Sequence, residues 1–257
     1  MNLNVIHEDS DMLVVDKPAG MIVNKADTAK GLVTLQDVVD DKFQFSDLTF
    51  PTESNEEYMV DGYNKLDEFK SRSGIVHRLD KETSGIILIA KNPKTFIKLQ
   101  KQFKDKTIQK TYTTLVHGKI EKGSGEVIAP IGRLPWNRMR FGIFPEGRPA
   151  HTNYSVLSHM TLAEGKFKED FSLVEVYPQT GRTHQIRVHF QYLKHPVFGD
   201  ELYAGRKTGR DDRKFVNRHF LHASKISLNH PTTNKLVEYE SKLPEELEAF
   251  LKKLVKE

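Results

Sequence analysis

The sequence predicts an α+β fold with a largely antiparallel, mixed sheet and flanking helices. Short β-branched or apolar runs recur along the 257 residues, whereas helical periodicity is confined to a few segments. Strands and helices do not alternate regularly, as a parallel βαβ sheet would require. A hydrophobic fraction of 37% is enough for a sizeable core, and we expect one domain over residues 1–257.

In the first third of the chain, MLVVDKPAGMIV at 12–23 predicts a strand, a turn and a second strand. Pro18 fixes φ and Gly20 permits a positive φ, which suits the turn. Residues 40–73 are acidic and poor in periodicity, so we expect a long surface insertion that is partly helical or mobile. The continuous apolar run GIILIA at 85–90 is typical of a buried strand.

In the middle of the chain, Pro93 follows an asparagine and is expected at the start of a helix. Residues 108–116 have β-branched strand character, residues 117–170 are rich in turns, and FSLVEVY at 171–177 predicts another strand. The apolar face of the helix comprises Phe96, Leu99 and Phe103.

Towards the C-terminus, residues 178–183 predict a turn with Thr183 as the N-cap of a helix over 184–194. Pro244 is expected in the first turn of a last helix. Two further strands are expected at 226–228 and 236–239.

The net charge of +4 conceals an uneven distribution. Residues 1–70 hold 6 basic and 15 acidic side chains, whereas residues 71–257 hold 33 basic and 20 acidic ones. The basic region is expected to attract a polyanion, and nucleic acid is the first candidate. The alternative is a solvated surface that is simply rich in lysine.

The composition also excludes several classes of protein. No run approaches 18 apolar residues, so we expect no membrane span. The N-terminus lacks the basic and apolar regions of a secretory signal, and we therefore expect a cytoplasmic protein. The absence of cysteine excludes disulfides, thiolate nucleophiles and cysteine-based zinc sites.

The first candidate functional residue is Asp80, which lies between Arg78 and Lys81 just before the buried strand. It has two interpretations. One is a structural carboxylate in a turn or an ion pair. The other is a catalytic carboxylate that nearby positive charge keeps ionised.

The second candidate is the cluster GRTHQIRVH at 181–189. His184 and His189 are five residues apart, which does not suit a shared metal on a helix. Backbone N–H groups at the helix start and the Arg182 guanidinium favour a phosphate, although a solvated basic helix face is the alternative. Arg187 lies at the border of the apolar stripe, where arginines fold over the core edge and some reach a buried carboxylate.

These motifs resemble one known family. GIVHRLDKETSG at 74–85 is similar to the HRLDxxTSG signature of the RluA-type pseudouridine synthases. Four other blocks resemble the family in the same order: EDSDMLVVDKPAGMIV at 8–23, QKTYTTLVHG at 109–118, PQTGRTHQIRVHFQYLKHPVFGDELYA at 178–204 and LHASKISLNHPTTNK at 221–235.

The resemblance implies the pseudouridine synthase catalytic fold and the isomerisation of uridine to pseudouridine in RNA. The N1–C1′ bond breaks, the uracil turns, and C5 bonds to C1′. The family needs no metal or redox cofactor. Its members modify ribosomal or transfer RNA, and we expect a monomer whose partner is RNA.

The resemblance also assigns roles to residues. Asp80 matches the catalytic aspartate, which either attacks the ribose or abstracts a proton. Arg187 matches the arginine that pairs with that aspartate, and Tyr112 matches the tyrosine that stacks on the uracil. Arg78 matches an arginine that fills the gap left by the flipped nucleotide. The residues expected to contact RNA or line the pocket are Arg78, Lys110, Arg182, His184 and Ile186.

Two departures from the family are expected to matter. The insertion at 40–73 is longer and more acidic than the usual connection, and no segment matches the small S4 RNA-binding domain of many relatives. Residues 40–73 and 132–150 are candidates for target choice. We expect a basic groove around Asp80 and Arg187, with the insertion off the RNA path or guarding its edge.

Three alternative functions share some of these features. A non-catalytic RNA-binding or ribosome-assembly factor on the same scaffold would not require Asp80, Tyr112 and Arg187 together. A protein kinase is disfavoured because Leu79 interrupts the His-Arg-Asp order and no glycine-rich loop precedes it. A zinc nucleobase deaminase requires cysteine ligands.

Overall fold

The computed structural model describes residues 3–25, 31–45, 58–164 and 167–256, which form two compact units. The first unit comprises residues 1–108 and 225–241, and the second comprises 109–224 and 242–257. Strand β12 (Leu221–Asn229) begins in the second unit and ends in the first. Among the described helices, none is long and apolar enough to cross a membrane.

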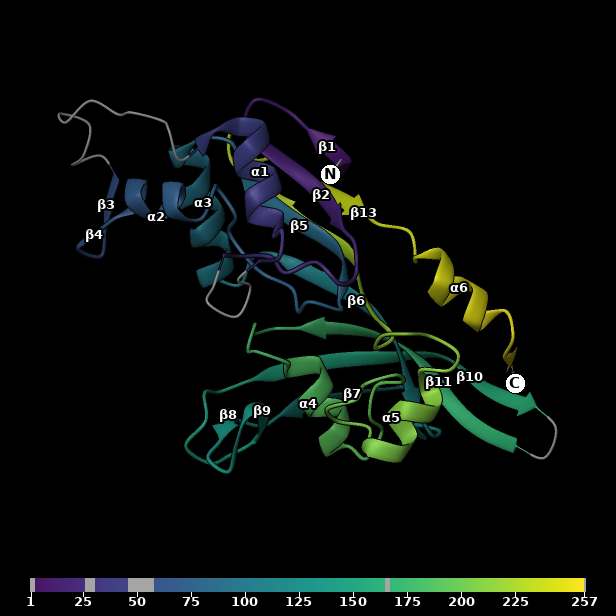
Figure 1. Cartoon of the computed structure of the whole chain (residues 1–257). Helices are drawn as coiled ribbons and strands as arrows, with labels where there is room; N and C mark the ends of the chain where they lie inside the picture. The colour runs from purple at the N-terminus through teal and green to yellow at the C-terminus, as the bar shows by residue number, and fades with distance from the viewer. Residues whose placement is uncertain (1–2, 26–30, 46–57, 165–166, 257) are drawn as a thin grey trace. The chain divides into compact units, whose positions relative to one another are not determined.

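The first unit contains a sheet with the strand order β1–β2–β5–β12, and β13 pairs with β12 (Figure 1). The pairings of β2 with β1 and β5, and of β12 with β13, are antiparallel. Its other elements are β1 (Asn4–Glu8), β2 (Met12–Lys17), α1 (Leu35–Phe43), β3 (Met59–Val60), β4 (Tyr63–Asn64), α2 (Lys65–Ser71), β5 (Ser84–Ala90), α3 (Pro93–Lys104) and β13 (Leu236–Glu240).

Strand β5 and helix α3 form where the sequence predicts them. Every residue of β5 is buried. The Asn92 side chain caps α3 by accepting a hydrogen bond from the Thr95 N–H, and Pro93 occupies the first turn. Phe96 and Leu99 are fully buried on the inner face of the helix.

Two expectations for this unit are wrong. No strand follows the turn at Gly20; instead the carbonyls of Ile22 and Val23 accept hydrogen bonds from the start of α1. The insertion is not entirely a surface feature either, because Phe69 of α2 is fully buried and packs against the ring of Phe96. Residues 46–57 of the insertion lie outside the described residues.

The second unit contains the strand order β6–β11–β10–β14, with β7 also paired with β10. The registers of β6 with β11, and of β10 with its three neighbours, are antiparallel, which confirms the predicted sheet type. Its elements are β6 (Gln109–His117), β7 (Ser124–Ile128), β8 (Ile131–Leu134), β9 (Asn137–Ile143), β10 (His151–Glu164), β11 (Phe167–Pro178), α4 (Gln185–Tyr192), α5 (Arg206–Asp212), α6 (Glu245–Leu251) and β14 (Val255–Lys256).

The alternation of β6 divides this core into two faces, because successive side chains of a strand point to opposite sides. Val116 and the half-buried Tyr112 pack in a cluster that includes Ile186 and Phe190 of α4. Leu115 packs in a second cluster that includes Phe171, Phe198, Phe220 and Phe250. Tyr112 therefore shares a face of the strand with α4.

Candidate active site

The Asp80 loop, residues 76–83, leads into β5 of the first unit. Asp80 is half-buried, whereas Arg78 and Lys81 on either side are exposed. The Thr83 N–H donates to the Asp80 carbonyl at 3.1 Å, which closes a turn just before the strand. The loop thus presents a carboxylate and two exposed cations from the end of a fully buried strand.

The Lys17 side chain anchors the backbone of this loop through hydrogen bonds. Its side chain is fully buried, and its ammonium donates to the carbonyls of Pro18, Met21 and Lys81 at 2.8, 2.9 and 3.1 Å. The Gly20 N–H also donates to the Lys81 carbonyl at 2.8 Å. A buried ammonium needs such acceptors, so the KPAG turn fixes the backbone beside Asp80.

His77 fastens the other end of the loop. Its Nε2 accepts a hydrogen bond from the Leu88 N–H of β5 at 2.8 Å, and its ring lies 4.9 Å from that of Phe103 on α3. An imidazole nitrogen that accepts a hydrogen bond carries no proton. The histidine of the HRLD motif is therefore a structural acceptor.

Helix α4 of the second unit carries the other candidates. Its N-cap is His184, with φ at +56°, and not the expected Thr183. No role was predicted for Gln185, yet its Oε1 accepts hydrogen bonds from the Thr180 hydroxyl and the Arg182 N–H. Its amide nitrogen donates to the His151 carbonyl and to the Thr152 hydroxyl. One buried amide thus orders the turn before α4, whose start has no side-chain cap hydrogen bond.

Arg187 makes a buried, two-pronged ion pair with Asp200. Its Nε lies 2.6 Å from Oδ2 and its Nη2 lies 2.9 Å from Oδ1. Asp200 is fully buried and also accepts from the N–H groups of Leu202 and Tyr203. The pairing of Arg187 with Asp80 stays a prediction, because those residues belong to different units.

Tyr203 links α4 to the β8–β9 hairpin. Its hydroxyl accepts the Phe141 N–H at 3.0 Å and lies 2.9 Å from Nδ1 of His184. The guanidinium carbons of Arg187 and Arg140 lie 5.0 and 5.3 Å from its ring centroid, within the range of cation–π attraction. The Arg140 Nε is buried without a hydrogen-bond partner.

Tyr112 and Lys110 lie on the same face of β6, two residues apart. Tyr112 is half-buried against the cluster that contains Ile186. Burial lowers the pKa of the Lys110 ammonium to about 8. The second unit therefore brings Tyr112, Ile186 and Arg187 together around α4, while Asp80 and Arg78 belong to the first unit.

A basic pocket of about 340 Å³ lies beside the start of α4. Arg182 lines it from the turn before α4, and its Nε donates to the Pro149 carbonyl at 3.0 Å. Arg133 also lines it, and its guanidinium lies 5.0 Å from the ring centroid of Phe141. The third arginine of this arginine pocket is Arg148. Three guanidinium groups beside an aromatic ring suit phosphate and base contacts.

Metal-like spacing occurs elsewhere, at Asp9, Asp11 and His230, whose ligand atoms lie within 4.8 Å of one another. Burial opposes ionisation of Asp9, but hydrogen bonds from His7, His230 and backbone N–H groups place its pKa well below the usual range.

His189 does not pair with His184, because both its ring nitrogens contact oxygens of Thr152 and Ala129.

Comparison with known proteins identifies the family. The model of the RNA pseudouridylate synthase family matches residues 11–192. The chain is 37% identical over 256 residues to an uncharacterized RNA pseudouridine synthase, YlyB, of Bacillus subtilis. The alignment covers 100% of this chain and 74% of that protein. It is 33% identical to ribosomal large subunit pseudouridine synthase D of Nitrosomonas europaea, over 97% of this chain and 64% of that protein.

A solved structure agrees. The human RNA pseudouridylate synthase domain containing 1 superposes with a TM-score of 0.70 at 28% identity, over 100% of this chain and 89% of that one. The chain belongs to the RNA pseudouridylate synthase family and is an RNA-modifying isomerase, which confirms the resemblance seen in the sequence.

Sequence reasoning missed Gln185, Asp200 and Tyr203. All three lie within the block at 178–204 that carried the resemblance. Most of their hydrogen-bond partners lie 13 or more residues away in the chain. Neither these partners nor the burial of the three side chains is visible in the sequence. The only local signal was Arg187 at the edge of the apolar stripe, a position from which some arginines reach a buried carboxylate.

Proposed function

We propose that this enzyme converts specific uridines of large-subunit ribosomal RNA to pseudouridine, with Asp80 as the catalytic carboxylate. The observation that carries the assignment is the Asp80 loop itself. It presents a half-buried carboxylate beside exposed Arg78, on a backbone that the buried Lys17 ammonium holds. Such fixed placement is what a catalytic group requires.

The other assignments follow the same logic. Tyr112 offers an aromatic face to a flipped uracil, which tolerates a base that must turn during the reaction. Ile186, buried in the same cluster, forms an apolar wall. Arg187, held in place by Asp200, supplies positive potential for an ionised Asp80. Lys110, Arg182 and His184 contact the RNA.

We propose that the β8–β9 hairpin and the arginine pocket select the target. Trp136 and Met139 of this region are each 76% exposed, which favours stacking on unpaired bases. Arg133 and Arg148 of the pocket would bind phosphates. The side chain of Arg138, another candidate, lies outside the described residues.

Asp80→Asn tests the chemistry. We expect this variant to bind RNA with unchanged affinity and to release no tritium from RNA labelled at carbon 5 of uridine, because the amide can neither attack nor accept the proton. Asp16→Asn, which changes an equally half-buried carboxylate on β2, should keep activity. Normal turnover by Asp80→Asn would contradict the assignment.

Deletion of the gene, followed by mapping of pseudouridines with carbodiimide primer stops, tests the substrate. We expect one or a few stops to vanish from large-subunit ribosomal RNA, as the name of the Nitrosomonas relative suggests. Loss from transfer RNA alone would contradict this choice. Cytoplasmic location and a monomeric state are parts of the same proposal, and gel filtration checks the second.

A further inference from the structure

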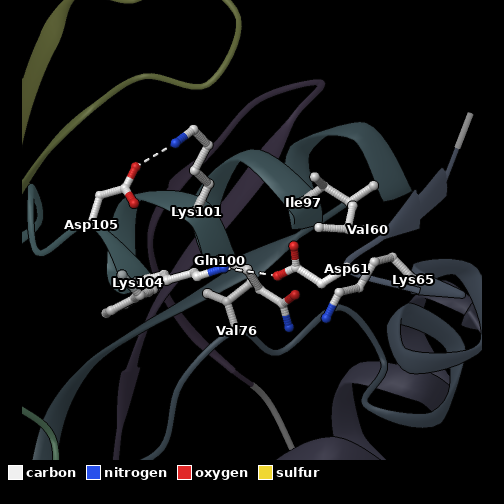
Figure 2. A pocket seen from close by; sticks show the side chains of 10 residues that line it. Val60, Asp61, Lys65, Val76, Ile97, Gln100, Lys101, Lys104 and Asp105 are labelled. Carbon is white, nitrogen blue, oxygen red and sulfur yellow. Dashed lines mark hydrogen bonds and ion pairs between the residues drawn. The ribbon is translucent and has the colours of Figure 1, made fainter. Parts of the chain in front are cut away.

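A second pocket, of about 540 Å³, lies in the first unit between α3 and the β3–β4 hairpin (Figure 2). Its apolar lining comes from Val60 on β3, Ile97 and Phe103 on α3, and Val76. Val76 directly precedes His77 of the Asp80 loop, and the Phe103 ring contacts the His77 ring at a tilt of 36°. The α3 pocket therefore adjoins the loop, and its volume is in the range of ligand-binding cavities.

The rim of the α3 pocket carries three lysines and two carboxylates, Asp61 and Asp105, and the Asp105 carboxylate is paired with the Lys101 ammonium. Lys101 and Lys104 of α3 have side chains that are 73% and 71% exposed, and Lys65 lies opposite them (Figure 2). Helix α3 carries four lysines and no acidic residue. An apolar base below a lysine rim matches the two parts of a nucleotide, a base that stacks and a phosphate that takes cations.

Asp61 occupies the place where a phosphate would lie. It sits in the two-residue turn of the β3–β4 hairpin, where Asp61 and Gly62 both have positive φ. Its carboxylate lies 2.8 Å from the Lys104 ammonium (Figure 2). Both side chains are well exposed, so the pair contributes little free energy and is readily exchanged for another anion.

We propose that the α3 pocket binds one nucleotide of the substrate RNA, outside the target uridine, with its base on the apolar lining and its phosphate on Lys101 and Lys104 in place of the Asp61 carboxylate. This rests on the proposed function. It gives the described part of the acidic insertion a role in RNA selection, because the β3–β4 hairpin supplies both Val60 and the competing Asp61.

Two substitutions should change affinity in opposite directions. The probe is a fluorescein-labelled single-stranded oligouridine of ~12 nucleotides, titrated with the full chain at several salt concentrations. Lys104→Gln should weaken binding about fivefold and lower the salt slope by about 0.7, as expected for one lost phosphate contact. Asp61→Asn should tighten binding several-fold, because the competing carboxylate is gone.

The Glu248–Lys252 pair on α6 is the matched control, because its side chains are similarly exposed, at 55% and 71%. Lys252→Gln and Glu248→Gln make the same changes in net charge far along the chain. We expect either to shift affinity less than twofold. Equal effects at both pairs, or weaker binding by Asp61→Asn, would overturn the proposal.

Contact with the base is tested separately by crosslinking a probe that contains 4-thiouridine. Peptide mass spectrometry should locate an adduct within residues 97–103. If the wild-type protein forms pseudouridine but gives no adduct there, the α3 pocket proposal fails and the proposed function stands. If the protein forms the adduct but releases no tritium, the proposed function fails and nucleotide binding in the α3 pocket stands. If polyglutamate displaces the probe and no adduct forms, the α3 pocket binds an acidic protein partner. That result would overturn the proposal that it binds a nucleotide.

Discussion

The loop that carries Asp80 and the helix that carries Arg187 are held in place by different kinds of contact. In the loop, Lys17 donates to three backbone carbonyls and His77 accepts a backbone N–H. At the helix, Arg187 forms an ion pair with Asp200, so that both partners are charged side chains. Contacts to backbone fix the path of a loop whatever its side chains, whereas an ion pair fixes one side chain and compensates its charge.

The difference predicts how each region fails. Removing one member of a buried ion pair leaves an uncompensated charge, which costs more free energy than removing a side chain whose partners are neutral backbone groups. Four changes, taken from the largest expected effect to the smallest, test whether the helix depends on charge and the loop on backbone contacts.

Arg187→Ala should have the largest effect. It leaves the fully buried Asp200 carboxylate without its guanidinium, and we expect the free energy of unfolding to fall by about 3–5 kcal/mol. Denaturation in urea measures it. Adding Asp200→Asn should recover part of the loss, whereas additive losses in the double variant would show that the two residues do not interact.

His117, also in the second unit, extends the comparison to pH. It lies 2.8 Å from Glu169 and 3.0 Å from Asp212, and although burial opposes protonation, these carboxylates raise its pKa to about 9. A raised pKa stabilises the fold below the unfolded value of ~6.5, and this contribution of up to about 3 kcal/mol is lost as the pH rises towards 9.

Urea denaturation of wild type and His117→Gln between pH 6 and 9.5 measures this dependence. The difference in the free energy of unfolding between the two proteins should be largest at the acidic end and should shrink through pH 9. A difference that stays constant with pH would mean that His117 is held by packing against Phe171 and Phe198 and not by charge.

Lys17→Met should cost about 2 kcal/mol, because three carbonyls lose a charged donor while the apolar stem is kept. We expect a fall in kcat as well, since the Lys81 carbonyl beside Asp80 loses a partner. Lys25→Met is the control, because its side chain is 51% exposed. A stability loss with unchanged kcat would show that Lys17 supports the fold but does not position Asp80.

His77→Phe should have the smallest effect, about 1 kcal/mol. The new ring can still pack on Phe103, but the Leu88 N–H loses its acceptor. Hydrogen exchange should quicken at the Leu88 amide and stay unchanged at Leu13 of the neighbouring strand β2. Uniform acceleration across β5 would indicate that His77 acts through packing.

The sequence predicted those features that depend on local pattern. The apolar run of β5, the asparagine cap and proline of α3 and the HRLD block are each contained within a few consecutive residues. The family followed from the order of such blocks. The N-cap of α4 was predicted wrongly, because the helix begins one residue later, after His184 in the left-handed region, and the preceding turn is ordered by Gln185.

The sequence by itself therefore determined the family, the sheet type and the residues that are candidates for catalysis, because motif order and hydrophobic periodicity are properties of the linear chain. Only the tertiary structure decided what holds them: Asp200 for Arg187, three carbonyls for Lys17, and two carboxylates that keep His117 charged. These are matters of burial and of partners distant in the chain, and burial sets the strength of a charge or a hydrogen bond only once the chain has folded.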